Sequence, residues 1–358
     1  MDVIVVGNTK ARLQALWRRD IRRRLMAGGL DMAAALARAG MMVNARGRGA
    51  IFTLHHVRPK QPRPLQPSGH LEVTPDFLAQ AIERLAAEGY EFISLAEVPA
   101  RLASQAKQPF AAFTLDDGYR NNAEHALPVF ARYGVPFTIF VTRGFAERTH
   151  SLWWETLGDL LSQQAELTFD FGSGPEVIDL TSEARKFDAF DRFADHVGAT
   201  DEASAVSRIN ATARRHGVEP LQITADLTMD AAELKALAQN PLVSLGAHTI
   251  SHRALSRLSP EDARTEMLHS ADYVQTLTGT RPTSMAYPYG TRRAIGERDY
   301  AIAQELGFAV AVTTQPGTLG DRHMKQLTGL PRISLNGFYQ QSRYVSALAS
   351  GIPFALVR

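Results

Sequence analysis

The sequence predicts an α/β fold, a distorted (β/α) barrel of seven strands with a helical insertion. From about residue 50, short apolar runs alternate with segments of helical periodicity, a pattern typical of parallel strands joined by crossover helices. The conspicuous acidic and histidine residues come directly after these runs, and the carboxyl ends of barrel strands form the face on which barrel enzymes carry their chemistry. A single barrel of this kind fits within 358 residues.

The first half of the pattern gives expected strands at 50–54, 92–95 and 110–115. A helix is expected to begin after Thr74, because a threonine is a favourable N-cap and Pro75 suits the first helical position. Gly89 is placed to end this helix. Further along the chain we expect helices at 123–133, 259–277 and 300–306, and strands at 135–141, 242–246, 284–287 and 309–313.

The region 151–229 breaks this alternation. It is polar, has helical periodicity at 182–197, and contains no convincing buried strand. We therefore predict three parts: a basic N-terminal helical extension (1–49), a barrel (50–336) with an insertion at about 151–229, and a helical C-terminal tail (337–358). Trp153 and Trp154 in the insertion are expected to be buried, with stacking on a sugar as the alternative.

The composition excludes several function classes. The chain has no cysteine, which removes disulfides and thiolate sites and leaves any metal to His, Asp and Glu. A net charge of +2 implies no polyanionic partner such as nucleic acid for the body of the protein. Because no window is long and apolar enough to span a membrane and no signal peptide is recognisable, we expect a protein of the cytoplasm or of the cytoplasmic face of the inner membrane.

Basic residues are concentrated near the N-terminus. They are Lys10, Arg12, Arg18, Arg19, Arg22, Arg23 and Arg24, opposed by Asp2 and Asp20. One interpretation is peripheral contact with an anionic membrane, since Leu13, Leu16 and Trp17 make the segment amphipathic. The other is a solvated helix, or residues that precede a true start at Met26.

The segment FTLDDGY at 113–119 places two adjacent carboxylates at the end of an apolar run. Such a pair is costly unless a positive partner such as a metal ion lies against it. His248 and His252 are four residues apart, which on a helical turn would point both imidazoles to one side. Together with Asp117 they form a candidate site for a divalent ion, Zn²⁺ first, with Co²⁺ or Ni²⁺ as alternatives.

The chemistry of such a site requires a proton acceptor and a proton donor. Asp116 is adjacent to the candidate ligand Asp117 but points elsewhere, which makes it the natural general base. His55 follows the first strand and is a candidate acid for the leaving group. A purely structural role for His55, and confusion with the neighbouring His56, remain the alternatives.

Three motifs resemble those of the polysaccharide deacetylase family, also called NodB-homology or carbohydrate esterase family 4 enzymes. They are Thr114-Leu-Asp116-Asp117-Gly118, His248-Thr-x-x-His252 and Ala286-Tyr-Pro-Tyr289-Gly290, and the resemblance covers about residues 50–335. It implies a deacetylase barrel in which Asp116 is the base and Asp117, His248 and His252 bind the metal. It also implies that the backbone N–H of Tyr289 helps to stabilise the oxyanion.

The sequence departs from the best-known branch of this family at two positions. Ala286 replaces the arginine that pairs with the catalytic aspartate, and Arg332 either approaches Asp116 in its place or is structural. Leu330-Pro331-Arg332 lacks the histidine of the terminal Leu-x-His motif. In another branch, the poly-N-acetylglucosamine deacetylases, an early Tyr-His element supplies this acid, and Leu54-His55 resembles that element.

The expected function is metal-dependent removal of N-acetyl, or O-acetyl, groups from a polysaccharide or glycan precursor. Two alternatives stay open: a hydrolase of small cyclic amides or imides on the same fold, and a glycan-binding barrel without catalytic activity.

Overall fold

The computed structural model describes residues 9–356, with side chains described from residue 21 onward. The described chain divides into two compact units. The larger contains residues 30–61, 70–151 and 221–356, and the smaller contains residues 9–29, 62–69 and 152–220.

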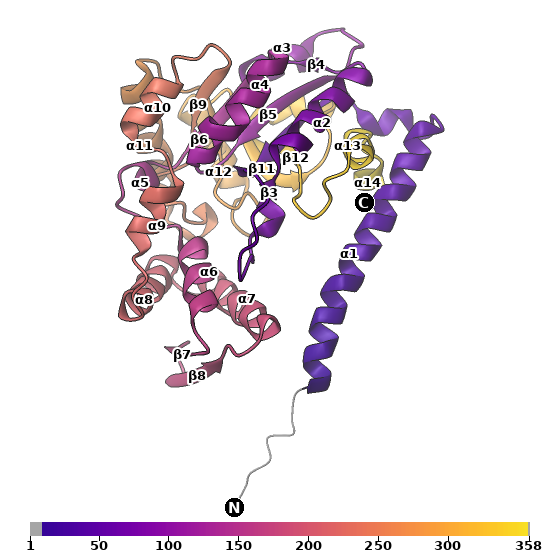
Figure 1. Cartoon of the computed structure of the whole chain (residues 1–358). Helices are drawn as coiled ribbons and strands as arrows, with labels where there is room; N and C mark the ends of the chain where they lie inside the picture. The colour runs from indigo at the N-terminus through magenta and orange to yellow at the C-terminus, as the bar shows by residue number, and fades with distance from the viewer. Residues whose placement is uncertain (1–8, 357–358) are drawn as a thin grey trace, which may run out of the picture. The chain divides into compact units, whose positions relative to one another are not determined.

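The larger unit is built on a closed parallel barrel of seven strands (Figure 1). In spatial order they are β1 (Gly49–Leu54), β12 (Leu330–Ser334), β11 (Val310–Pro316), β10 (Ser284–Ala286), β9 (Val243–Ala247), β6 (Phe137–Val141) and β5 (Phe110–Leu115). Pairing of β1 with β5, from Gly49 opposite Phe110 to Leu54 opposite Leu115, closes the barrel. The short β4 (Glu91–Phe92) extends the start of β5, and β2 (His56–Val57) pairs with β3 (Glu72–Val73). The predicted barrel is confirmed.

Helices of this unit surround the strands. They are α2 (Pro75–Ala87), α3 (Val98–Ala103), α4 (Leu127–Tyr133), α5 (Arg143–Ala146), α10 (Ala231–Leu237), α11 (Pro260–Thr278), α12 (Glu297–Glu305), α13 (Ser342–Ala349) and α14 (Ile352–Ala355). Thr74 caps α2 by accepting a hydrogen bond from Phe77 N at 3.2 Å, as the sequence predicts. Gly134 ends α4 with a φ of 65°, which favours glycine.

Burial on both faces explains why the strands appear as continuous apolar runs. Every residue of β1 and β5 is buried. Ile51 and Ala112 belong to one core cluster, and Phe52 and Phe113 belong to another that includes residues of the covering helices. Parallel strands covered in this way are apolar throughout rather than alternating. Their rigid packing fixes the positions of the residues that follow each carboxyl end.

Three local predictions are wrong. The strand expected at 92–95 ends at Phe92, because Ser94 and Glu97 form a capping box that begins the 3₁₀ turn Leu95–Glu97. The strand expected at 309–313 does not end there, because residues 314–316 continue β11 as far as Pro316. No strand was expected at 330–334, where Pro331 and Arg332 interrupt the apolar run, yet this segment is β12.

The smaller unit contains α6 (Trp153–Gln163), α7 (Glu183–Ala199), α8 (Glu202–Arg215) and a hairpin of β7 (Glu166–Asp170) and β8 (Pro175–Asp179). The hairpin escapes the sequence pattern because most of its residues are exposed. Trp153 and Trp154 are buried, as expected, and Trp153 stacks on Phe190 at 6.3 Å between ring centroids.

Two further helices, α1 (Thr9–Arg38) and α9 (Pro220–Leu227), run across the division between the units. Of the basic N-terminal residues, Lys10, Arg12, Arg18 and Arg19 lie outside the described side chains, as do Leu13, Leu16 and Trp17, so their predicted role stays a prediction. Among the described residues, no helix is apolar over a length that would cross a membrane.

Candidate active site

The carboxyl ends of the barrel strands bring the predicted site residues together. Asp116 and Asp117 follow β5, His248 follows β9, and His55 follows β1. Tyr289 lies in the loop after β10. Except for His55 and Tyr289, these side chains are at least nine-tenths buried. The predicted gathering of the motifs at one end of the barrel therefore agrees with the structure.

The candidate metal ligands form one compact buried group. Asp117, His248 and His252 each offer an atom such that all three atoms lie within 4.8 Å of one another. His248 Nε2 and His252 Nε2 lie 3.5 Å and 3.3 Å from Asp117 Oδ1. The expected helical turn at 248–252 is wrong: the segment is a loop in which Thr249 and His252 have φ values of 65° and 58°.

Backbone strain is concentrated at this site. Six non-glycine residues of the described chain have positive φ, and four of them are Asp117, Thr249, His252 and Tyr289. Left-handed backbone is costly for residues with a Cβ and persists where the surrounding structure enforces it. The strain supports a functional role for this loop cluster.

The chemistry of these side chains fits a divalent metal ion. Asp117 Oδ1 is buried and accepts no hydrogen bond from the described residues. His248 Nδ1 lies 2.7 Å from the carbonyl oxygen of Ala286, which can only accept, so Nδ1 carries the proton and the lone pair of Nε2 faces Asp117. Burial lowers the pKa of His252 to about 4, which keeps this imidazole neutral and able to ligate.

Glu266 of α11 holds the histidine loop in place. Its carboxylate is buried and accepts hydrogen bonds from Ile250 N at 2.7 Å, Ser251 N at 2.9 Å and Ser251 Oγ at 2.5 Å. Ser270, one turn further along α11, accepts from His248 N at 3.1 Å. These bonds replace the helical hydrogen bonds that the loop lacks.

Arg332 forms a buried bidentate ion pair with Asp116. Its Nη1 and Nη2 atoms lie 2.7 Å and 2.6 Å from the two carboxylate oxygens, and its Nε donates to Thr313 O at 2.8 Å. The sequence left two roles for Arg332, pairing with Asp116 or a structural role, and the structure shows the pairing. Burial alone would raise the pKa of Asp116, but the charge and hydrogen bonds of Arg332 outweigh it and hold that pKa below its usual range.

His55, and not His56, faces the acidic pair. His55 Nε2 lies 3.9 Å from Asp116 Oδ2, and its side chain is 17% exposed. His56 is fully buried, its ring is tilted against that of Tyr119 with centroids 3.7 Å apart, and its Nδ1 lies 2.8 Å from Asn121 Nδ2. Burial lowers the pKa of His55, and the charges of Asp116 and Asp117 offset this only in part. The lowered pKa makes the protonated imidazole a stronger acid.

The loop after β10 places Tyr289 beside the ligands. The Tyr289 ring lies 5.0 Å from that of His252, and Thr314 Oγ1 donates to Tyr289 O at 2.6 Å. At the next residue, Gly290, a Cβ would stand 2.4 Å from Thr314 N, so this close approach of two loops requires glycine. The backbone of Tyr289 is thereby held next to the candidate metal ligands.

The family model for polysaccharide deacetylases matches residues 103–172 and 200–311, together just over half of the chain. The chain belongs to the polysaccharide deacetylase family. The match covers all three motifs in full, the first at 114–118, the second at 248–252 and the third at 286–290. It confirms the class of hydrolase expected from the motifs.

Individual relatives agree with the family. The Bacillus subtilis (strain 168) protein YxkH, named provisionally as a polysaccharide deacetylase, is 31% identical over 85 residues, which are 24% of this chain and 29% of that protein. The deacetylase PplD of Streptococcus pyogenes matches the fold with a TM-score of 0.53 at 20% identity, covering 81% of this chain and 92% of its own. IcaB of Ammonifex degensii matches with a TM-score of 0.52 at 15% identity, covering 84% and 98%.

Sequence reasoning missed the residues that support the site. Glu266 and Ser270 lie on the predicted helix at 259–277, but nothing in a helical pattern indicates a contact with residues 15 or more positions upstream. Asn121, which lies beside the ring of His56, follows the first motif closely enough to have been a candidate. An amide side chain within a few positions of a catalytic motif is the sequence signal that could have identified it.

Proposed function

We propose that this protein is a divalent-metal-dependent hydrolase that removes N-acetyl groups from a glycan or glycan precursor. The observation that carries the proposal is the buried group of Asp117, His248 and His252 beside the Asp116–Arg332 ion pair. Membership of the polysaccharide deacetylase family supports the same reaction class. The matched S. pyogenes deacetylase is described in complex with acetate, the product expected here.

Asp117, His248 and His252 would hold the metal through one carboxylate oxygen and two imidazole nitrogens. When bound, the metal polarises the acyl carbonyl and lowers the pKa of the attacking water. Zn²⁺ suits this ligand set best, and Co²⁺ or Ni²⁺ are alternatives.

The remaining steps use side chains of the chain itself. Asp116, kept ionised by Arg332, accepts a proton from the attacking water. Tyr289 N–H donates a hydrogen bond to the developing oxyanion. His55 then gives a proton to the departing amine as the C–N bond breaks, so that one amide and one water yield acetate and a free amine.

The arrangement disfavours the alternative of a barrel that only binds glycans. That alternative depended on the missing third-motif arginine and terminal histidine. Arg332 and His55 instead lie against Asp116 from β12 and from the end of β1. A hydrolase of cyclic amides or imides remains the competing catalytic function.

The test is acetate release from oligomers of N-acetylglucosamine by Zn²⁺-loaded protein, with equal amounts of acetate and free amine expected. His55→Gln should lower kcat by about 10²- to 10⁴-fold, the contribution of a positioned proton donor. His269→Gln, an exposed histidine on α11, is the matched control and should retain full activity. Absence of acetate release together with turnover of a cyclic imide would overturn the proposal.

A further inference from the structure

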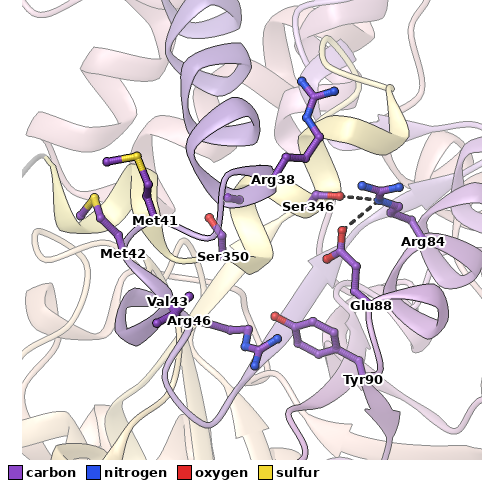
Figure 2. A pocket seen from close by; sticks show the side chains of 11 residues that line it. Arg38, Met41, Met42, Val43, Arg46, Arg84, Glu88, Tyr90, Ser346 and Ser350 are labelled. Atoms are coloured by element: carbon purple, nitrogen blue, oxygen red, sulfur yellow. Dashed lines mark hydrogen bonds and ion pairs between the residues drawn. The ribbon is translucent and has the colours of Figure 1, made fainter.

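A pocket of about 350 Å³ lies at the end of the barrel opposite the candidate active site. Its walls come from the segment that joins α1 to β1, the end of α2 and the end of α13 (Figure 2). Tyr90 stands immediately before β4, and the 3₁₀ turn Val43–Arg46 stands shortly before β1. Since the strands are parallel, residues that precede them lie at the amino ends, whereas the candidate catalytic residues follow the carboxyl ends.

The pocket carries excess positive charge. Three arginines, Arg38, Arg46 and Arg84, line it together with one acid, Glu88. Arg84 Nε lies 2.9 Å from Glu88 Oε1 and 2.6 Å from Ser346 Oγ. Within the described part of the chain, Arg38 and Arg46 form no ion pair with a carboxylate.

Arg46 is held over the ring of Tyr90, with its guanidinium carbon 5.9 Å from the ring centroid. The Tyr90 hydroxyl donates to Ala349 O at 2.9 Å, and burial raises the pKa of Tyr90, so the phenol stays neutral. Tyr90 therefore adds no negative charge against Arg46. Guanidinium groups in this situation suit a phosphate, which they bind through paired N–H donors.

One rim of the pocket is apolar and exposed. The side chains of Met41, Met42 and Val43 are 52%, 40% and 66% exposed, and Figure 2 shows the two methionines across the pocket from Arg84 and Tyr90. The turn that presents them is fixed, because Met41 N donates to Leu36 O at 3.0 Å and Gly40 N to Ala37 O at 3.0 Å, the bonds of a Schellman motif.

The backbone of Met42 is strained. Its φ is 53°, a left-handed conformation that glycine or asparagine would adopt more easily. Met41, Met42 and Val43 are thus held outward beside Arg38 and Arg46, which have no carboxylate partner among the described residues. This combination suits binding to a surface that is anionic at its face and apolar beneath. A free phosphate would gain nothing from this rim, whereas a lipid would bury it.

We propose that this pocket docks the protein onto membranes by binding the phosphate of an acidic phospholipid, with Met41, Met42 and Val43 inserted among the acyl chains. A volume of about 350 Å³ accommodates a lipid headgroup and not a glycan chain. Docking at the amino ends of the strands leaves the carboxyl-end face, with the candidate active site, open to substrate.

The experiment is flotation of the full-length protein with vesicles of phosphatidylcholine containing phosphatidylglycerol. Arg38→Gln/Arg46→Gln should weaken binding by about ten-fold or more, since each arginine at an anionic surface contributes several-fold. Met41→Ser/Met42→Ser/Val43→Ser should weaken it by about ten-fold through lost insertion. Both variants should release acetate from soluble oligomers at the wild-type rate.

Matched controls are Arg132→Gln, an exposed arginine that also lies over a tyrosine ring, and Met324→Ser, an exposed methionine elsewhere on the same unit. Both should bind vesicles like the wild type.

Unchanged binding by the two pocket variants would overturn the proposal, because it would place membrane contact elsewhere, for example on the basic N-terminal segment. Equal binding to pure phosphatidylcholine vesicles would also overturn it. Binding of soluble glycerol phosphate without any vesicle binding would assign the pocket to a free phosphate ligand instead.

Discussion

Replacing Asp116 by asparagine should abolish most turnover while leaving metal binding intact. Asparagine has the same shape but cannot accept the proton of the attacking water, and general-base catalysis contributes about 10²- to 10⁴-fold. Asp116 Oδ1 and Oδ2 both face Arg332, whereas the candidate metal ligand is the next residue, Asp117. We therefore expect kcat to fall by that factor with unchanged metal content.

Asp299→Asn is the matched control for this variant. Asp299 is also buried, and its Oδ1 accepts from Arg298 Nη2 at 2.7 Å, but it lies on α12 away from the candidate site. Both variants lose a buried carboxylate that is paired with an arginine, so both should lose stability, and only Asp116→Asn should lose turnover. A folded Asp116→Asn protein with near wild-type kcat would remove Asp116 from the mechanism.

Replacing Arg332 by glutamine should both destabilise the protein and move its pH dependence. Removing one partner of a buried ion pair leaves the other charge uncompensated, which costs about 3–5 kcal/mol in the free energy of unfolding. The Arg332 side chain is fully buried and that of Asp116 is 3% exposed, so water cannot replace the lost bonds. The loss should be measured by urea unfolding at neutral pH.

The sign of the pH effect follows from the pKa of Asp116. In the native protein Arg332 holds this pKa low, so the pair stabilises the fold above the ordinary carboxyl pKa and this contribution is lost as pH falls. In Arg332→Gln, burial is opposed only by the weaker effects of His248 and His55, so the pKa of Asp116 should rise and the stability deficit should shrink in acid. The acidic limb of kcat/KM should move to higher pH, because a protonated Asp116 cannot act as a base.

A double variant tests whether the stability loss in Arg332→Gln comes from the unpaired charge of Asp116. Arg332→Gln/Asp116→Asn removes both charges and should regain much of the stability that Arg332→Gln loses, without regaining activity. An acidic limb that does not move in Arg332→Gln, or a double variant as unstable as the sum of the two single variants, would contradict the role assigned to this ion pair.

The barrel and its ligand set could be predicted because both depend on local pattern. Strands buried on both faces appear as apolar runs; His248 follows one directly, and Asp117 is the second residue after another. The topology of a parallel barrel then requires these positions to meet at one end. The position of His55 follows from the same reasoning, since His55 comes directly after β1.

The Arg332–Asp116 pair could not be derived in this way, because it joins residues 216 positions apart. Its strand, β12, contains a proline and an arginine and therefore lacks an apolar pattern. The arginine is tolerated inside the barrel only because Asp116, Thr114 and Thr313 satisfy its donors. The conformation of 248–252 was mistaken for the same reason, since the carboxylate of Glu266 that holds this loop comes from a separate helix.

The most direct test of the account is the metal content per chain of the purified protein, measured by elemental mass spectrometry beside Asp117→Ala. The account predicts about one divalent ion per wild-type chain and little in the variant, because the buried carboxylate is one of the three candidate ligands found among the described residues. Asp299→Asn should bind metal like the wild type. No bound metal in the wild type after reconstitution with Zn²⁺, Co²⁺ or Ni²⁺, or equal metal in Asp117→Ala, would contradict the assignment of this site.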